Sequence, residues 1–312
     1  MIKRAIVTGG TGVTGNALVR TLLKQGCYVT VLVRPNSFRA KSLLNCASGL
    51  ELIACGMDQY LEIQNQLTGR QYDAFFHLAW DGSTGKNKVD NRNNHCLQTK
   101  NILYSLDAVE LCARLNCPVF LMTGSQAEYG RKDHPVSEEE EKHPENGYGM
   151  AKLCAEGMTR LLCKQYGIRH IWPILFSIYG PNDATESLID TSIRALLHGE
   201  NLPYTAGEQM WDYLFSYDAA DALILLAEKG KDGETYNVGF GKQRPLREFI
   251  SDLYRVVAPG DTPRLGELPY SNNQVMFLGA KINKLQETTG FVPACSFEDG
   301  IRQIVKSIAP MK

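Results

Sequence analysis

The sequence lacks the marks of several large classes of protein. Its 33 Lys and Arg residues nearly balance its 34 Asp and Glu residues, so the formal net charge is −1. A near-neutral chain without a basic stripe gives no electrostatic case for nucleic-acid binding. No apolar run approaches the ~18 residues that a membrane-spanning helix needs, and no charged-then-apolar signal segment opens the chain. We therefore expect a cytoplasmic protein that binds neither nucleic acid nor membranes.

The cysteines and histidines are too scattered to form a site of their own. The nine Cys include no Cys-x-x-Cys pair, and their odd number leaves one unpaired in any disulfide scheme. Reduced thiols therefore fit better than a disulfide framework. The six His show no metal-ligand spacing, so we expect no metal. The one dense charge run, Glu138 to Lys142, is predicted to be a solvated loop.

What the sequence does contain is an alternation of short apolar runs with longer amphipathic ones. This alternation is typical of right-handed βαβ units and of a parallel sheet covered on both faces. The predicted strands are Ala5–Thr8, Tyr28–Val33, Glu51–Cys55, Ala74–Ala79, Pro118–Met122 and His170–Phe176, and the predicted helices between them are Gly12–Gln25, Asn101–Leu115 and Tyr148–Gln165.

After about Tyr179 the alternation loosens. Helices are predicted at Ser187–Leu197, Ala219–Glu228 and Leu246–Val257, separated by segments rich in Pro, Gly and Asn. The predicted fold class is α/β: a Rossmann-type, doubly wound parallel sheet with a smaller C-terminal α/β substrate lobe. Residues 1–176 would form the dinucleotide-binding domain, to which 211–240 return, and 177–210 with 241–312 would form the substrate lobe.

A glycine-rich loop joins the first predicted strand to the first predicted helix. The run TGGTGVTG places Gly9, Gly12 and Gly15 at every third position. Gly9 allows a sharp turn at the strand end, Gly12 lets the backbone approach a pyrophosphate, and Gly15 lets the helix pack closely on the sheet. The helix N-terminus then offers free N–H groups to the phosphates. The order strand, loop, helix predicts a dinucleotide site.

Arg34 directly follows the second predicted strand. An acid at this position binds the ribose of NAD, whereas an Arg accommodates the 2′-phosphate of NADP. Ser37, Arg39 and Lys41 add further donors, and no carboxylate ends the strand. The pattern favours NADP(H), with NAD(H) possible; a solvated basic loop is the other interpretation.

A serine, a tyrosine and a lysine form a candidate catalytic set. Tyr148 and Lys152 are four residues apart on a predicted helix and so share a face. Ser125 follows the fifth predicted strand, at the edge where open α/β sheets bind ligands. A free Tyr has a pKa of about 10 and is a poor base, but a nearby ammonium stabilises the phenolate. Tyr148 could then exchange a proton with a sugar oxygen while a hydride moves.

Several motifs together resemble the extended short-chain dehydrogenases/reductases, the NAD(P)-dependent nucleotide-sugar epimerase/dehydratase family. The resemblance covers nearly the whole chain. It rests on TGGTGVTG at 8–15, HLAW at 77–80, GSQAEYG at 124–130, YGMAK at 148–152, IYGPND at 178–183, WDYLFSYDAADA at 211–222, TYNVG at 235–239 and the closing segment Asn283–Gly300.

The resemblance implies roles for particular residues. Ser125, Tyr148 and Lys152 would be the catalytic triad. The implied cofactor-binding residues are Gly9, Thr11, Gly12, Val13, Gly15, Arg34, Asp58, Leu78, Ala79, Tyr148 and Lys152. The implied substrate-binding residues are Trp80, Gln126, Ser177, Asn182, Trp211 and Arg244. The substrate would be a nucleotide-sugar, and a homodimer would form through the helices predicted at Asn101–Leu115 and Tyr148–Gln165.

Two departures from the family pattern bear on the reaction. Dehydratases of this group usually carry Asp-Glu directly after the triad Ser or Thr, where this chain has Gln126-Ala127; we therefore do not expect 4,6-dehydration. Many members carry an Arg that contacts the sugar diphosphate where this chain has Trp211. Trp211 could stack on a base or belong to the core.

Two reactions and one non-catalytic role stay open. Reduction of a 4-keto-(6-deoxy) sugar, with Tyr148 as acid/base, is favoured by the NADP(H) interpretation and by the run Gly207–Tyr213, which similar ketoreductases carry. The alternative is an NAD-dependent nucleotide-sugar 4-epimerase, which would return the hydride that it takes. A non-catalytic dinucleotide sensor is less favoured because the Ser, Tyr and Lys are all present.

Overall fold

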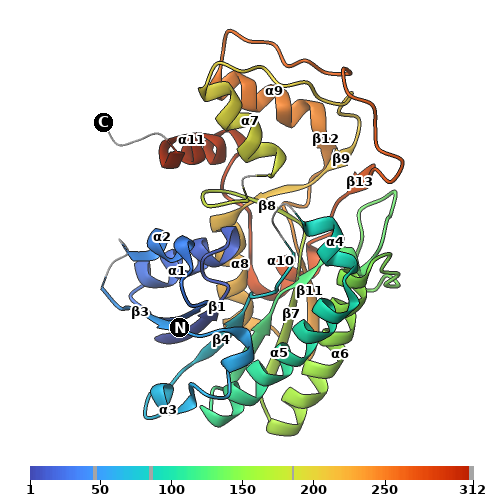
Figure 1. Ribbon diagram of the computed structural model, residues 1–312. Coiled ribbons are helices and arrows are strands. Elements are labelled where there is room, and N and C mark those ends of the chain that lie inside the picture. Colours follow the sequence, from blue (N-terminus) through green and yellow to red (C-terminus); the bar gives the residue numbers. More distant parts are fainter. Residues whose placement is uncertain (45–47, 84–86, 185, 309–312) are drawn as a thin grey trace.

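A computed structural model describes residues 1–44, 48–83, 87–184 and 186–308. A parallel sheet forms the lower part of the molecule in Figure 1. Its strand order is β11-β7-β5-β4-β1-β2-β3, and β6 pairs with β7. The strands are β1 (Arg4–Thr8), β2 (Tyr28–Val33), β3 (Leu50–Ala54), β4 (Ala74–His77), β5 (Val119–Met122), β6 (Gly124–Ser125), β7 (Arg169–Leu175) and β11 (Glu234–Val238).

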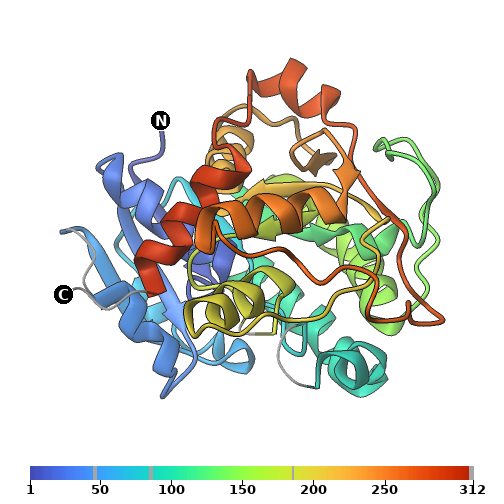
Figure 2. The ribbon, with the colours of Figure 1, turned by 90° about the horizontal axis from the view of Figure 1, so that it is seen from above.

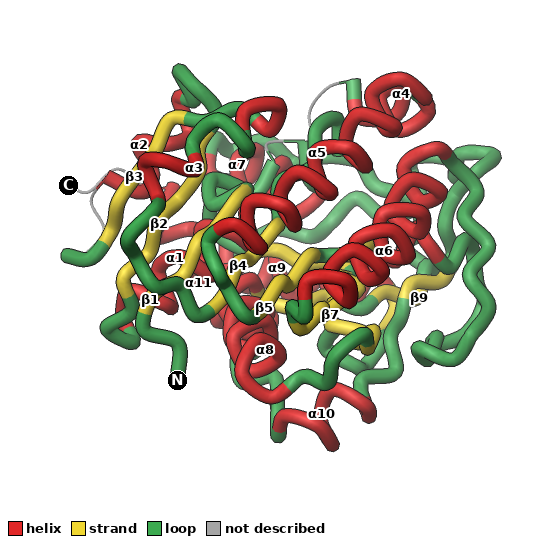
Figure 3. The backbone as a smooth tube through the Cα atoms, turned by 90° about the horizontal axis from the view of Figure 1, so that it is seen from below, coloured by secondary structure: helices red, strands yellow, loops and turns green. Residues whose placement is uncertain are grey.

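Helices connect these strands and cover both faces of the sheet. The α-helices are α1 (Val13–Lys24), α2 (Lys41–Leu44), α3 (Gln64–Leu67), α4 (Lys88–Asn93), α5 (His95–Arg114), α6 (Gly147–Tyr166), α7 (Leu188–Leu197), α8 (Ser216–Lys229), α9 (Leu246–Val257), α10 (Asn283–Thr289) and α11 (Phe297–Ile308). Short 3₁₀ turns are η1 (Phe38–Ala40), η2 (Met57–Gln59) and η3 (Gln126–Glu128). Figure 3 shows α5 and α6 side by side along one face of the row of strands.

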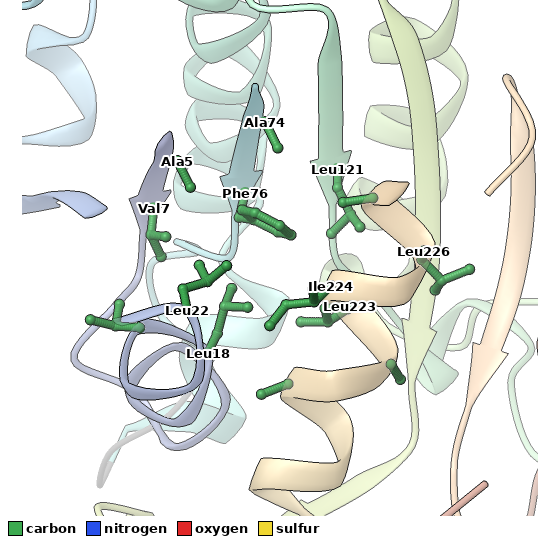
Figure 4. Packing of buried hydrophobic residues seen from close by; sticks show 14 of the residues in the cluster. Ala5, Val7, Leu18, Leu22, Ala74, Phe76, Leu121, Leu223, Ile224 and Leu226 are labelled. Carbon is green, nitrogen blue, oxygen red and sulfur yellow. The ribbon is translucent and has the colours of Figure 1, made fainter. Parts of the chain in front are cut away.

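The alternation of side chains along each strand builds two separate cores. Ala5 and Val7 of β1 pack with α1 and α8 on one face (Figure 4), whereas Ile6 between them packs with α5 and α6 on the other. Side chains of a strand point to opposite faces in turn, so a strand covered on both faces must be apolar throughout. Each fully buried aliphatic or aromatic side chain contributes roughly 1.5–3 kcal/mol.

A smaller lobe lies above the carboxyl ends of the main strands. In it β8 (Ser177–Tyr179) pairs with β10 (Tyr213–Phe215) in parallel. A second small sheet places β9 (Met210–Trp211) between β12 (Arg244–Pro245), which is antiparallel to it, and β13 (Phe277–Leu278), which is parallel. Its helices α7, α9 and α11 enclose an aromatic core that contains Tyr179, Tyr213, Phe249 and Phe297. Figure 2 shows α9 and α11 lying against each other.

One buried carboxylate ties the lobe to the main sheet. Asp212, which is fully buried between β9 and β10, accepts hydrogen bonds from the backbone N–H groups of Phe240 at 2.6 Å, Gly241 at 3.0 Å and Ala280 at 3.3 Å. The amide of Gln243 donates to it at 3.1 Å. Burial raises the pKa of Asp212, and these hydrogen bonds oppose the shift.

The structure confirms the predicted α/β class with its Rossmann-type sheet and its smaller C-terminal lobe. Helices α2, α3, α4, α10 and α11 and the short strands of the lobe were not predicted, and two elements of the sheet layers differ as well. Helix α5 begins at His95 rather than at Asn101, because the side chain of Asn94 caps it by accepting the N–H of Leu97 at 3.1 Å. Strand β11 extends the sheet beyond β7, at an edge where no strand was predicted.

The structure bears on two further expectations without testing them fully. Residues 211–240 supply α8 and β11 to the main sheet, while β9 and β10 belong to the lobe; the domain boundaries themselves stay a prediction. Within the described residues, no helix has the length and apolar character needed to cross a bilayer.

Candidate active site

The glycine loop runs from β1 into α1 with little space on its inner side. Gly9 has a φ of +70°, and a Cβ there would lie 2.7 Å from the backbone of Leu78 and Ala79. A Cβ on Gly15 would lie 2.2 Å from the carbonyl oxygen of Gly9. These two glycines are therefore required by the packing of the protein itself.

Gly12 differs from its two neighbours in the motif. Among the described residues, a Cβ there would meet only the carbonyl oxygen of Gly9, at an ordinary 3.5 Å, so their packing does not demand a glycine. Gly12 is also the N-cap of α1, and no side chain caps the helix. Uncapped N–H groups with open space before them fit a pyrophosphate. Thr11 and Val13, the other loop residues of the predicted site, flank this N-cap.

The next two strand ends carry the residues predicted for the adenosine part of a dinucleotide. Arg34 follows β2, its side chain is 73% exposed, and its guanidinium lies 3.7 Å from Asp81 Oδ1. Asp58 lies in η2 just after β3 and is exposed. Its carboxylate fills the space where a Cβ of Gly56 would stand, at 2.4 Å.

The end of β4 is fastened to the end of β1. Thr8 Oγ1 lies 2.8 Å from His77 Nδ1 and accepts the N–H of Ala79 at 3.2 Å. Burial lowers the pKa of His77 to about 3, and the nearby Lys152 adds to the shift, so His77 is neutral at physiological pH. These bonds hold the backbone of Leu78 and Ala79 against Gly9 in the glycine loop.

The predicted triad comes together at the carboxyl edge of the sheet. Ser125 ends β6, and Tyr148 and Lys152 lie on one face of α6. Lys152 Nζ donates to the carbonyl of Thr123 at 2.7 Å. It also lies 4.0 Å from the centre of the Trp80 ring, which packs edge-on against Tyr148 at 6.0 Å.

Burial dominates the protonation of both α6 side chains. It raises the pKa of Tyr148, while the Ser125 side chain and the cationic Arg92 lower it. It lowers the pKa of Lys152 to about 7, against an opposing effect of Glu128. Desolvation disfavours the charged form of each group, so at neutral pH Tyr148 holds its proton and Lys152 is poised to lose one.

Sequence reasoning missed the buried carboxylate of Glu128. It is fully buried beside the triad and accepts the backbone N–H of Ser125 at 2.7 Å and the ammonium of Lys142 at 3.0 Å. The indole N–H of Trp172 donates to it at 3.2 Å. Lys142 also binds Glu156 at 2.5 Å, one turn beyond Lys152 on α6.

The charge run Glu138 to Lys142 was predicted to be a solvated loop, and that was wrong for its two ends. It is a loop, but the Lys142 side chain is only 15% exposed because it lies between two carboxylates. Glu138 accepts the backbone N–H of Asn237 at 2.7 Å. For Glu128 the available signal was the Glu within GSQAEYG, two residues before Gly130, which by itself looks like a surface residue.

A cavity of about 490 Å³ adjoins the triad. Gln126, one of the predicted substrate residues, lines it together with Arg92 and Phe176. Its volume lies within the roughly 300–1,000 Å³ of small-molecule sites. It reaches the triad only through the neighbours Arg92 and Gln126, because Ser125, Tyr148 and Lys152 are not among its lining residues.

The other predicted substrate residues lie at the border of the lobe. The indole N–H of Trp211 donates to Ser177 Oγ at 2.9 Å, which joins β9 to β8. Asn182 donates to Asn16 Oδ1 at 3.1 Å, so it lies over the start of α1.

Arg244 pairs with β9 directly opposite Trp211. Its guanidinium is already engaged: it lies 2.6 Å from Asp252 and 3.9 Å from the centre of the Phe249 ring. The structure therefore groups five of the predicted residues at the triad, namely Ser125, Tyr148, Lys152, Trp80 and Gln126. Trp211 and Ser177 form a second group, and Arg244 points into the lobe.

The described residues bear on the expectations that the chain has no disulfide framework and no metal site. The described cysteines are all free thiols, and Cys46 lies outside the described residues. In the part of the chain that the structure describes, no three His, Cys, Asp or Glu side chains are grouped so as to hold a metal ion.

The sheet and the glycine loop together are those of a Rossmann-type dinucleotide-binding protein. The model of the NAD dependent epimerase/dehydratase family matches residues 5–239. The chain therefore belongs to this family, and the resemblance inferred from its motifs is confirmed.

Individual relatives are distant but extend over most of the chain. The UDP-N-acetyl-alpha-D-glucosaminuronate decarboxylase of Bacillus cytotoxicus is 25% identical over 98% of this chain and 98% of the relative. A trifunctional UDP-glucose 4,6-dehydratase/UDP-4-keto-6-deoxy-D-glucose 3,5-epimerase/UDP-4-keto-L-rhamnose-reductase of Arabidopsis thaliana is 25% identical over 97% of this chain, which spans only 47% of that longer protein.

A solved structure shares the whole architecture. The UDP-N-acetylglucosamine 4-epimerase of Methanobrevibacter ruminantium, in complex with UDP-N-acetylmuramic acid, superposes with a TM-score of 0.86 at 25% identity. The match covers 98% of this chain and 97% of that one. The similarity extends through the C-terminal lobe, beyond the residues that the family model matches.

Proposed function

We propose that the protein reduces a 4-keto sugar of a nucleotide-sugar, most simply a 4-keto-6-deoxy sugar, with Tyr148 as the proton donor. The observation that carries this proposal is the arrangement of the triad: Tyr148 and Lys152 share a face of α6 at the carboxyl edge of the sheet, beside Ser125 at the end of β6. Burial raises the pKa of Tyr148, so the phenol holds a proton that it can give to a ketone oxygen. A bound dinucleotide would supply the hydride. Ser125, whose side chain adjoins Tyr148, would donate a hydrogen bond to the same oxygen, and the cavity beside Gln126 would admit the sugar.

A 4-epimerase is the second candidate. The similarity to the UDP-N-acetylglucosamine 4-epimerase favours it, and the same three side chains could serve it by moving the proton in both directions. Dehydration is not proposed, because Gln126 and Ala127 are neither acid nor base. A non-catalytic sensor would need none of the three side chains.

Matched incubations distinguish these reactions. The enzyme is given NADPH with nucleotide-linked 4-keto-6-deoxyhexoses, and separately NAD with nucleotide-linked hexoses, and the sugars are analysed by mass spectrometry and NMR. Net loss of NADPH with a reduced sugar supports the reductase; a C4 epimer without net cofactor turnover supports the epimerase instead. Tyr148→Phe is expected to lower the rate roughly 10²–10⁴-fold.

Tyr28→Phe is the control for that variant. Tyr28 is 57% exposed at the opposite end of β2, and the substitution should leave the rate unchanged. If Tyr148→Phe turned over every sugar and cofactor pair as well as wild type, the catalytic assignment would be wrong.

We further propose that NADP(H) is preferred, because Arg34 stands exposed at the end of β2 and its one ion pair among the described residues is a loose contact with Asp81. Titration with NADPH and NADH tests this, with Arg34→Ala expected to weaken NADPH binding alone. The control is Lys24→Ala, because Lys24 is an exposed cation at the far end of α1. Tighter binding of NADH, or no effect of Arg34→Ala, would refute the preference.

We also propose a homodimer through α5 and α6. Large apolar side chains stand exposed on these two helices, namely Leu103, Met150, Met158 and Leu161. Sedimentation velocity should show a dimer that Leu161→Glu converts to a monomer, while Leu197→Glu, on α7, leaves it intact. A monomeric wild type would exclude this interface.

A further inference from the structure

The cavity beside the triad carries several cationic side chains, and most of them are neutralised locally. Arg131 lies 2.6 Å from Glu145. Lys132 lies 3.9 Å from Glu140, and the ring of His134 lies 3.0 Å from the same carboxylate. Each of these cations therefore contributes little net charge to the interior of the cavity.

Arg92, on α4, is different. Its guanidinium carbon lies 5.0 Å from the centre of the Tyr148 ring, and the side chain lines the cavity. Its Nε is shielded from solvent and has no hydrogen-bond partner, and the ion pairs among the described residues do not include it. A shielded, unpartnered donor on a charged group is costly, so this arrangement points to a role at the site.

The groups that face Tyr148 differ in how reliably they carry charge. Ser125 approaches it from the end of β6, Glu128 from η3 and Arg92 from α4. Lys152 lies one turn further along α6. Burial lowers the pKa of Lys152 to about 7, so part of it is uncharged at neutral pH. An Arg guanidinium stays protonated in proteins. Arg92 lowers the pKa of Tyr148, whereas Glu128 raises it.

We propose that Arg92 is a further functional residue of the proton transfer, an electrostatic partner that stabilises the phenolate of Tyr148. The inference rests on the proposed function, in which the O–H bond of Tyr148 breaks and a new O–H bond forms on the substrate oxygen. The electron pair of the broken bond stays on Tyr148 Oη as a negative charge. A guanidinium over the ring favours that charge over the neutral phenol, and the same holds for the reverse transfer.

The test compares Arg92→Met and Arg92→Lys with the control Arg302→Met, at an exposed position on α11 outside the cavity, where the guanidinium is paired with Asp299 at 2.6 Å. Arg92→Met should lower kcat roughly 10-fold with little change in KM, since one charge a few ångströms away is removed. The loss should be larger above pH about 7, where Lys152 loses its proton. Arg92→Lys should recover most of the rate, and Arg302→Met should change it less than about 2-fold.

A second measurement does not depend on turnover. NMR of isotope-labelled tyrosine, with Tyr148→Phe used to assign the signal, should show a higher pKa of Tyr148 in Arg92→Met than in wild type. An unchanged pKa, a loss confined to KM, or an equal loss in Arg302→Met would overturn the inference. If the pKa rises while wild type turns over no sugar, the electrostatic role stands and the proposed function fails.

Discussion

Replacing Glu128 by Ala should be one of the most destabilising single changes in this protein. The substitution leaves the backbone N–H of Ser125 and the indole N–H of Trp172 without their acceptor, and a buried donor left unsatisfied costs about 1–3 kcal/mol. Lys142 loses one carboxylate but keeps its bond to Glu156 at 2.5 Å. We therefore expect a loss of about 3–5 kcal/mol, the range for breaking a buried ion pair.

Glu128→Gln separates the charge from the hydrogen bonds. Its amide oxygen can still accept from Ser125, but its N–H₂ group would face the ammonium of Lys142, so a loss of about 1–2 kcal/mol is expected. The assay is urea unfolding followed by far-ultraviolet circular dichroism. The control is Glu141→Ala, because the side chain of Glu141 is 85% exposed. The free energy of unfolding of this variant should lie within about 0.5 kcal/mol of that of wild type. A Glu128→Ala variant as stable as that control would refute the reasoning.

Three further outcomes follow from the site and the lobe. The value of kcat/KM should fall as pH rises through about 7, because Lys152 then loses the proton of its ammonium group. Because its pKa is lower in the folded than in the unfolded protein, the contribution of Lys152 to stability should increase between pH about 7 and about 10. A kcat/KM that does not change with pH over this range would exclude the assignment. Gly15→Ala should lose roughly 1–3 kcal/mol of stability in thermal unfolding, because its Cβ would meet the carbonyl of Gly9. Gly12→Ala should unfold at the same temperature as wild type but should no longer bind the dinucleotide in a titration. Equal unfolding temperatures of the two variants would contradict this. Asp212→Ala should lose at least about 3 kcal/mol, since four donors lose their acceptor, and unchanged melting would show that water replaces it.

The strands and helices were predictable because their signals are local. Strand β2 and helix α9 have the same bounds in sequence and structure, Tyr28–Val33 and Leu246–Val257, since each is a clear run of one periodicity. Strand β11 was harder, because ETYNV shows no strong run and becomes a strand only by pairing with β7.

The candidate site was predictable only where a motif carries it. The glycine loop and the set Ser125, Tyr148 and Lys152 could be identified from the spacing of the residues and the elements around them. Glu128 could not, because its burial depends on Trp172, 44 residues later, and on Lys142. Arg92 stands in a polar segment without periodicity, and only the fold places it over the Tyr148 ring.

The chain has three tryptophans, and each of them touches a residue of the candidate site. The contacts are Trp80 with Lys152, Trp172 with Glu128 and Trp211 with Ser177. The tryptophan fluorescence of this protein therefore originates around the candidate site. Indole emission responds to neighbouring charges and hydrogen bonds. Arrival of a dinucleotide or a sugar is therefore expected to be visible as a change in emission, without any label.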